Sequence, residues 1–285
     1  MSLKQTIKKL IPNFIKKKPS VNIAIKQQKE LNKLKLMPCN NSNLLESKKI
    51  SLENIFKSDD IITSWNKWQD KLDKFVIPDF TGGVNPGDRK AIYFLIRFFK
   101  PKSVLEIGTH IGASTVNIAA ALNFNQAECK MKSIFRTIDI RDVNSTYEKP
   151  WLEYGTDKSP IEIIKNIQCE SFVEFITDTS INYFEKTSDT YDFIFLDGDH
   201  SAKTVYQELP LALSKLNKGG VILLHDYFPN GNPLWSNNSI IHGPYLATER
   251  LIREGADIVI IPLGALPWST KLNSNVTSLA LCLKK

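Results

Sequence analysis

The chain has 285 residues, of which 42% are hydrophobic and 24% charged; this is an ordinary globular mixture and excludes wholesale disorder. No stretch approaches the roughly 18 apolar residues that a membrane-spanning helix needs, and residues 1–18 lack the apolar core of a secretory signal. The formal net charge is +7, but residues 1–35 hold ten lysines against one acid, which leaves 27 basic and 29 acidic side chains in the rest. The body of the protein is therefore not basic, and we expect no nucleic acid partner.

The cysteines indicate a reducing compartment. They are far apart and form no Cys-x-x-Cys pair, so neither a zinc site nor a disulfide framework is indicated. We therefore expect a cytoplasmic protein. The four positions are Cys39, Cys129, Cys169 and Cys282.

Residues 1–50 are expected to form a lysine-rich leader followed by a linker at 36–50. Apolar residues of the leader fall on one helix face, and lysines occupy much of the rest, although Pro12 weakens a continuous helix. Two interpretations stay open: a helix in peripheral contact with an anionic membrane surface, or an arm that is solvated or packs on its own domain. The apolar positions are Leu3, Ile7, Leu10, Ile11 and Phe14.

Residues 51–285 are expected to form one domain that begins with helices within 51–100. An apolar stripe from Ile61 to Phe75 predicts the first long helix, and the loop Thr81–Asp88 is rich in turn residues. A second helix is expected from Arg89 to Phe99, ended by Pro101.

Short apolar strands then alternate with helices. This alternation predicts an α/β fold with a mostly parallel sheet and helices on both faces. The last two strands have no long helix between them, which favours one antiparallel C-terminal strand. Strands are expected at Val104–Ile107, Ile134–Ile140, Val173–Thr177, Phe193–Leu196, Val221–Leu224, Ile258–Ile261 and Val276–Leu283. Helices are expected at Ser114–Leu122, Ile161–Ile167, Ile181–Glu185, Ala202–Leu216 and Gly243–Arg253.

A glycine-containing turn follows the first expected strand and leads into a helix. Small residues let the backbone pass close to a ligand, and the helix N-terminus supplies free N–H groups. The spacing is Gly-x-x-x-Gly, not the Gly-x-Gly-x-x-Gly of dinucleotide binding, so a pyrophosphate site is not indicated. A tight turn without a ligand is the alternative. The turn reads Glu106-Ile107-Gly108-Thr109-His110-Ile111-Gly112-Ala113-Ser114.

Acids stand where the next two strands end, Asp139 after the second and Asp178 after the third. At this edge of an open α/β sheet a carboxylate can accept both hydroxyls of a ribose, and a side chain after the third strand can reach an adenine amino group. Each acid alone could equally cap a helix or lie in a solvated turn. Together with the glycine turn, they favour a nucleoside site.

The densest group of reactive side chains follows the fourth and fifth strands. Asp197-Gly198-Asp199-His200 ends the fourth strand, and His225-Asp226 ends the fifth. If these strands are neighbours, Asp197 and Asp226 converge, and two close carboxylates repel unless a proton or a cation lies between them. Mg²⁺ suits such a place because it prefers oxygen ligands.

Three motifs together resemble a class I S-adenosylmethionine-dependent methyltransferase: Glu106–Thr115, Phe195–His200 and Lys218–Tyr227. The similarity runs from about residue 80 to the end of the chain and is greatest to the branch of catechol-type and macrocin-type sugar O-methyltransferases. The resemblance implies a Rossmann-like seven-stranded sheet with the last strand antiparallel, and S-adenosylmethionine as cofactor.

The resemblance also implies roles for particular residues. The methionine part of the cofactor is held by the turn, Asp139 holds the ribose, and Asp178 lies near the adenine. Cofactor contacts in the turn are expected from Glu106, Gly108, Thr109, His110, Gly112 and Ser114, and further ones from Gly83 and Asp197.

In catechol-type relatives a divalent metal binds acids that Asp197 and Asp226 match, so the resemblance implies Mg²⁺. The chain departs from that pattern at Tyr227, where a third ligand is often present. Asp199 matches the general base of macrocin-type relatives, His200 falls where catechol-type enzymes place a base, and His225 is a third candidate. The alternatives are that Asp199 caps the following helix and that His200 is structural.

The acceptor wall is expected in two places. Aromatic rings interleaved with amides suit a sugar or a polyhydroxylated ring, and they follow Asp226. Trp65 and Trp68, or the loop at Gly82 and Gly83, are a second source, although both tryptophans could equally be core. Pro267-Trp268 is expected to pack at the sheet edge. The residues after Asp226 are Tyr227, Phe228, Asn230, Trp235, Asn237, Asn238 and His242.

The leading hypothesis is a Mg²⁺-assisted O-methyltransferase acting on a hydroxyl of a small molecule. Two alternatives remain: a metal-independent methyltransferase with His200 or His225 as base, and a catalytically inactive binding protein of the same fold. A homo-oligomer is compatible with the sequence.

Overall fold

The computed structural model describes residues 19–72, 77, 78 and 83–285. The apolar positions expected for the leader and the end of the helix expected up to Phe75 lie outside these residues. The described helices are α2 (Pro19–Leu31), α3 (Leu52–Phe56), α4 (Asp59–Leu72), α5 (Pro86–Phe99), α6 (Thr115–Cys129), α7 (Pro160–Asn166), α8 (Ser180–Lys186), α9 (Ala202–Ser214) and α10 (Gly243–Arg253), with short 3₁₀ turns η2 (Ser47–Lys49), η3 (Pro150–Tyr154) and η4 (Pro229–Gly231). None of these described helices is long and apolar enough to cross a membrane.

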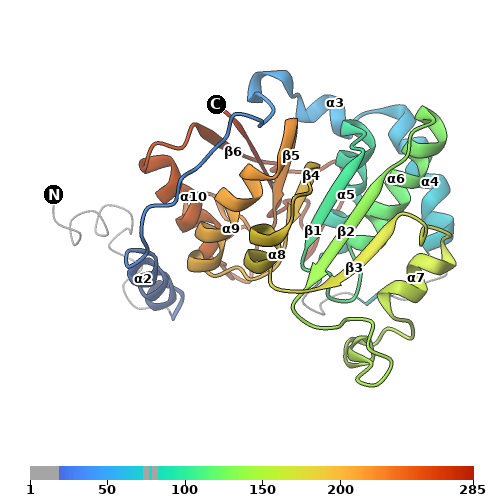
Figure 1. Cartoon of the computed structure of the whole chain (residues 1–285), viewed down its shortest axis with the longest axis horizontal. Coiled ribbons are helices and arrows are strands. Elements are labelled where there is room, and N and C mark those ends of the chain that lie inside the picture. The colour runs from blue at the N-terminus through green and yellow to red at the C-terminus, as the bar shows by residue number, and fades with distance from the viewer. Residues whose placement is uncertain (1–18, 73–76, 79–82) are drawn as a thin grey trace.

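Seven strands form one sheet in the order β3-β2-β1-β4-β5-β7-β6 (Figure 1). The strand β7 runs antiparallel to both β5 and β6, and the other neighbouring pairs are parallel, as the sequence predicts. The strands are β1 (Ser103–Ile107), β2 (Ile134–Asp139), β3 (Val173–Thr177), β4 (Tyr191–Leu196), β5 (Leu216–Leu224), β6 (Ile258–Pro262) and β7 (Ala280–Lys284).

Alternate residues of each central strand face two separate cores, which is why the strands are apolar throughout. In β1, Val104 belongs to the core under α3 to α7, and Leu105 to the core under α2, α8, α9 and α10. The predicted helices on both faces are therefore confirmed (Figure 1).

The strand β5 begins earlier than expected. Leu216, assigned to the preceding helix by its apolar spacing, is the first residue of β5, which then runs through the Gly219-Gly220 pair. Gly219 has φ +80°, a conformation that glycine adopts without strain, and pairing with β4 shifts register between Tyr191 and Phe193. The strand continues because its backbone finds partners on both sides of this irregularity.

One such partner is the expected linker, which packs on the sheet. The N–H of Leu45 donates to the carbonyl of Gly220 at 2.9 Å, and the N–H of Lys284 donates to the carbonyl of Leu45 at 2.9 Å. Leu44 is buried in the core under α9. This segment of the expected linker therefore packs on the sheet through its backbone and its apolar residues.

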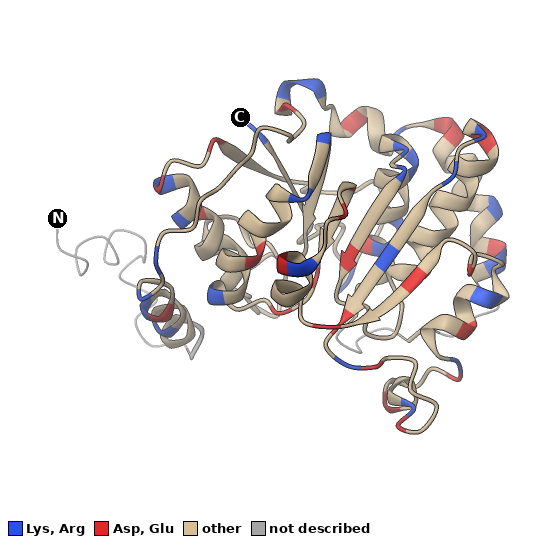
Figure 2. Cartoon of the chain, in the orientation of Figure 1, with Lys and Arg blue, Asp and Glu red and all other residues tan. Residues whose placement is uncertain are grey.

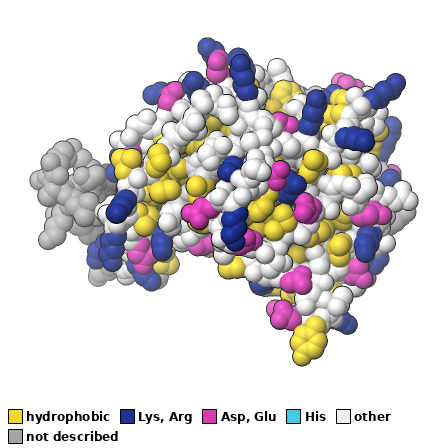
Figure 3. Space-filling model, viewed as in Figure 1, with side chains coloured by type: hydrophobic (Ala, Val, Ile, Leu, Met, Phe, Trp, Pro, Cys, Tyr) yellow, Lys and Arg dark blue, Asp and Glu magenta, His cyan; other side chains and the backbone are white. Residues whose placement is uncertain are grey.

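Charged side chains of both signs are interspersed along the helices and over the face of the molecule in view (Figures 2 and 3). This face has no continuous basic surface, in line with the near balance of charges outside residues 1–35.

Candidate functional site

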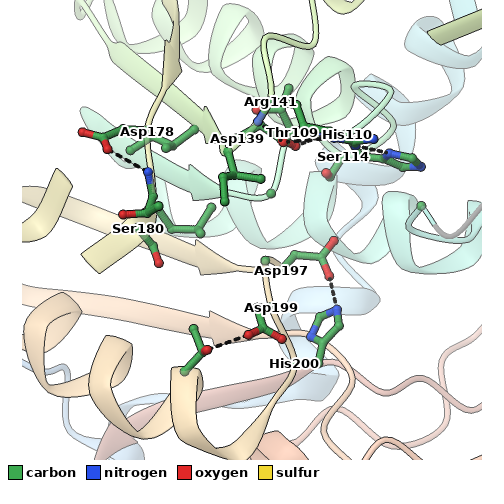
Figure 4. A pocket seen from close by; sticks show the side chains of 18 of the residues that line it. Thr109, His110, Ser114, Asp139, Arg141, Asp178, Ser180, Asp197, Asp199 and His200 are labelled. Carbon is green, nitrogen blue, oxygen red and sulfur yellow. Dashed lines mark hydrogen bonds and ion pairs between the residues drawn. The ribbon is translucent and has the colours of Figure 1, made fainter. Parts of the chain in front are cut away.

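A cavity of about 750 Å³ opens at the carboxyl ends of β1 to β4 (Figure 4). In an open α/β sheet this is the ligand-binding edge, and the strand order reverses here between β1 and β4. Ten of the predicted site residues line the cavity: Gly83, Gly108, Thr109, His110, Ser114, Asp139, Asp178, Asp197, Asp199 and His200. Four others do not line it: Glu106, Gly112, His225 and Asp226.

The turn between β1 and α6 is shaped by glycine. Gly108 has φ +99°, and a side chain there would collide with the backbone carbonyl of Asp197. Its N–H donates to the carbonyl of Ile138 at 2.8 Å, which ties the turn to β2. The backbone of β1 therefore passes directly against that of β4, as a ligand-cradling turn requires.

Glu106 lies beneath this turn and is fully buried. Its carboxyl accepts hydrogen bonds from the hydroxyls of Ser114 (2.5 Å), Thr115 (2.6 Å) and Thr137 (2.6 Å). Burial raises the pKa of Glu106 to about 7, although the three hydroxyls oppose the shift. Glu106 therefore acts on the cavity through the residues it holds.

Asp139 organises the second wall of the cavity. Its carboxylate accepts from the backbone N–H of His110 at 2.8 Å and from that of Arg141 at 3.0 Å. The Arg141 guanidinium reaches His110 Nδ1 at 3.1 Å, and the His110 ring packs edge-on to Tyr154 at 4.3 Å. The expected ribose carboxylate thus borders the cavity from a fixed position.

Asp178 lines the cavity and is also bonded at the start of α8. One carboxylate oxygen accepts from the N–H of Thr179 (2.8 Å) and the amide of Asn182 (2.6 Å). The hydrogen bond from Asn182 holds the pKa of Asp178 below its usual range, so it stays ionised beside the cavity.

Two carboxylates and two imidazoles meet at the opposite end of the cavity, and we call Asp197, His200, His225 and Asp226 the acid–histidine cluster (Figure 4 shows Asp197 and His200 facing one another). Asp197 Oδ1 lies 2.7 Å from His225 Nδ1 and 3.6 Å from His200 Nε2. Asp226 Oδ2 lies 3.4 Å from His200 Nε2 and 3.6 Å from His225 Nδ1. The predicted convergence of the two acids is therefore present, with ring nitrogens close to both.

Charged neighbours outweigh burial at both His225 and Asp226 of this cluster. Burial disfavours a charged His225, yet the carboxylates of Asp197 and Asp226 outweigh it and raise the pKa of His225 well above its usual value. Burial also opposes ionisation of Asp226, but His225 and His200 hold the pKa of Asp226 below its usual range. A His225 that holds its proton is a poor general base.

Asp199 is engaged by the start of α9. Its carboxylate accepts from the N–H of Ser201 (2.9 Å), the hydroxyl of Ser201 (2.9 Å) and the hydroxyl of Thr204 (2.6 Å). Although burial opposes the shift, these donors lower the pKa of Asp199. The N-cap of α9 is Ser201 itself, and Asp199 holds this cap residue in place. The donors around Asp199 weaken its carboxylate as a base.

Among the described residues expected to form the acceptor wall, Gly83 lines this cavity, whereas the residues after Asp226 and the two tryptophans do not. The aromatic residues after Asp226 are buried instead: Trp235 packs edge-on to Phe228 at 5.6 Å. Trp65 and Trp68 are core residues, with Trp68 Nε1 donating to the Asn117 amide oxygen at 3.1 Å. The residues that do not line it are Tyr227, Phe228, Asn230, Trp235, Asn237, Asn238 and His242.

Trp268 packs as expected, with its ring centroid 4.9 Å from that of Phe94. Its indole N–H donates to the carbonyl of Gly87 at 2.9 Å.

Several residues at the site escaped the sequence analysis. Arg141 and Tyr154 line the cavity, and the only sequence signal for Arg141 is its place two positions after Asp139. Asp88, which is fully buried at the start of α5, places Oδ2 3.5 Å from His225 Nε2. Asp88 lies far from His225 in the sequence and was assigned to the turn-rich loop Thr81–Asp88, so no local pattern could have found it.

The comparisons with known proteins agree with this geometry. Residues 105–227 match the sequence pattern of a family described as a methyltransferase domain. This segment resembles a methyltransferase domain. It holds the glycine turn, the acids after β2 and β3 and the acid–histidine cluster.

Two solved structures that share the fold of this chain are described as O-methyltransferases. One is the O-methyltransferase TomG from Streptomyces achromogenes, 16% identical over 81% of this chain and 92% of that chain, with a TM-score of 0.50. Another is a putative O-methyltransferase from Klebsiella pneumoniae, 15% identical over 93% of this chain and 98% of that chain, with a TM-score of 0.50. No curated protein sequence matches the chain.

Replacing Glu106 by Gln is expected to flatten the pH dependence of stability. In the folded methyltransferase domain the carboxyl holds its proton up to about pH 7, against an ordinary value of 4.5. The free energy of unfolding therefore falls as pH rises between these values, by about 3 kcal/mol at most for this one group. Urea unfolding at pH 5 and pH 7 would measure the loss. A Glu106→Gln variant that loses as much stability as wild type over this interval contradicts the assignment.

Proposed function

We propose that the protein is an S-adenosylmethionine-dependent O-methyltransferase that acts on a hydroxyl of a small molecule. The observation that carries this proposal is the single cavity that runs from Asp178 and Asp139 past the Gly108 turn to Asp197 and His200. A nucleoside and a reacting group can therefore occupy one space. The solved structure of TomG, which shares the fold, is described as a complex with SAM.

The chain offers a distinct contact for each part of this cofactor. Asp139 faces the cavity with a carboxylate that can accept from ribose hydroxyls, and Asp178 stands on the adenine side. The turn from Gly108 to Ser114 supplies backbone groups to the methionine part, held from below by Glu106. Gly83 lies opposite His110, where added side-chain atoms would meet its ring.

When bound, the cofactor supplies a methyl group on a sulfonium, which a nucleophile can accept directly. The protein's own task is to place the acceptor oxygen in line with that carbon, to exclude water and to favour loss of the hydroxyl proton. Asp197 and His200 of the acid–histidine cluster line the cavity at the end away from Asp178 and present polar groups there. A sugar or a polyhydroxylated ring is the acceptor class we propose, because its neighbouring hydroxyls can bond several such groups at once.

A divalent cation is the first proposed aid to deprotonation. Asp197 and Asp226 fit such an ion, because one oxygen of each carboxylate faces the same pair of imidazole nitrogens. A cation held there would lower the pKa of a hydroxyl bound to it. Mg²⁺ is the ion that two carboxylates alone suggest.

His200 as a metal-independent base is the second candidate. Its ring lines the cavity, and its side chain is 27% exposed, so an acceptor hydroxyl can reach it. The His225 ring does not line the cavity. Activity lost in EDTA and restored by added divalent cation supports the cation, whereas activity unchanged in EDTA supports His200.

Asp139→Asn is expected to weaken S-adenosylhomocysteine binding about 10- to 100-fold, because hydrogen bonds to an ionised acceptor are lost. Titration calorimetry measures this. Asp142→Asn, at an exposed acid close in sequence but outside the cavity, is the matched control and should bind as wild type does. Equal affinities in both variants would remove Asp139 from the cofactor site.

Asp197→Ala is expected to abolish methyl transfer while S-adenosylhomocysteine still binds, because the acid–histidine cluster loses a carboxylate and the nucleoside end of the cavity is untouched. Turnover with sugar and catechol acceptors, measured beside calorimetry, separates the two effects. Asp157→Ala, at an exposed acid outside the cavity, serves as control. Turnover near wild type in Asp197→Ala would refute the assignment of the cluster to chemistry.

A further inference from the structure

We propose that His200 and His225 are metal ligands together with Asp197 and Asp226, and that this site takes a divalent first-row transition ion in preference to Mg²⁺. The proposal rests on the proposed function, in which a cation at these acids assists the chemistry. It differs from the Mg²⁺ site of the proposed function because both imidazoles are ligands, which favours a transition ion.

The spacing of three facing atoms is compatible with one coordination sphere, because the ligand atoms of Asp197, His200 and His225 all lie within 4.8 Å of one another. A tetrahedral ion with bonds of about 2.1 Å holds its ligand atoms about 3.4 Å apart. Asp226 Oδ2 lies 3.4 Å from His200 Nε2 and 3.6 Å from His225 Nδ1, which is close to that spacing. Asp197 Oδ1 lies 3.6 Å from His200 Nε2 but 2.7 Å from His225 Nδ1, so this last contact has to open for an ion to enter.

The facing nitrogen of His225 has no competing hydrogen bond. The His225 side chain is more than nine-tenths buried, and neither of its ring nitrogens has a hydrogen-bond partner within the described part of the chain. The 2.7 Å approach of Nδ1 to Asp197 is therefore close without the alignment of a hydrogen bond. A buried ring nitrogen aimed at a carboxylate in this way is placed for a shared cation.

Asp88 supplies the outer partner that a metal-bound histidine requires. Its Oδ2 lies 3.5 Å from His225 Nε2, on the side of the ring away from the cluster, and its side chain is fully buried. The amide of Asn85 donates to the same oxygen at 2.6 Å and fixes it. A carboxylate behind a histidine orients the ring and presents its other nitrogen to the metal. Asp88 is thus a positioning residue for His225.

The donor set decides the metal. Mg²⁺ takes oxygen ligands, whereas imidazole suits iron, cobalt, nickel and zinc. Two ring nitrogens among four protein donors therefore favour these ions over Mg²⁺. Two carboxylates keep the site negative enough to hold a divalent charge.

Co²⁺ titration of the metal-free full-length chain tests the proposal. We expect one Co²⁺ per chain, visible absorption bands, and solvent-exchangeable, paramagnetically shifted imidazole N–H signals from both histidines in proton NMR. We also expect Co²⁺ to bind more than about tenfold tighter than Mg²⁺. Mg²⁺ binding equal to or tighter than Co²⁺, or Co²⁺ bound without imidazole signals, overturns the proposal.

Three variants assign the ligands. His200→Gln, at a partly exposed ring, should lose one shifted signal and weaken Co²⁺ binding beyond the roughly 10- to 100-fold expected for loss of an outer partner. Asp88→Asn should weaken it by about 10- to 100-fold and keep both signals. His110→Gln, at the cavity but outside the cluster, is the matched control and should bind Co²⁺ as wild type does. Unchanged binding in His200→Gln overturns the proposal.

Calorimetry with S-adenosylhomocysteine on the same samples distinguishes failure of the metal site from failure of the proposed function. Binding of the nucleoside without Co²⁺ binding leaves the proposed function standing and overturns the metal proposal alone. Co²⁺ bound by both imidazoles without nucleoside binding overturns the proposed function and leaves the metal site.

Discussion

The contact between the backbones that follow β1 and β4 is the constraint on which the site depends. Ile107 pairs with Leu196 in parallel register, so the next residues, Gly108 and Asp197, lie against each other without room for a side chain at 108. The strand order reverses at this pair, which sends β2 to one side and β5 to the other. Asp139, after β2, therefore lies on one side of the β1–β4 pair, and Asp226, after β5, lies on the other side. The Gly108 contact therefore lies between the end of the cavity at Asp139 and the end at Asp197 and His200.

Glu106 makes that contact rigid from below. A carboxyl group buried this deeply would be costly if ionised, and three hydroxyls from α6 and β2 satisfy it as a neutral or charged group. These bonds connect the floor of β1 to the first residues of α6, so the turn between them has fixed ends. The resemblance implied a contact between Glu106 and the cofactor. In the structure Glu106 lies beneath the turn, outside the cavity lining, and its carboxyl holds the Ser114 hydroxyl at the cavity.

Local patterns predicted the elements well and the distant contacts poorly. The strand Val173–Thr177 and the helix Gly243–Arg253 have the expected bounds, because apolar runs and caps are local signals. The start of β5 was wrong, because the Gly219-Gly220 pair indicates a turn unless its partners from the segment at Leu45 are known. The placement of Asp197 beside Asp226 followed from parallel strands. The placement of Asp88 beside His225 could not be predicted in this way, because only tertiary packing brings α5 against His225.

The charge of the acid–histidine cluster explains why the fold tolerates so many acids in one place. Asp88, Asp197 and Asp226 place three carboxyl groups in space that is nearly closed to solvent, and close carboxyl groups repel unless a proton or a cation lies between them. His225 supplies such a proton, because Asp197 and Asp226 raise the pKa of its imidazole well above the usual value. The divalent ion that we propose would replace protons in the cluster, so the same packing can stabilise the protein before the ion enters and hold the ion afterwards.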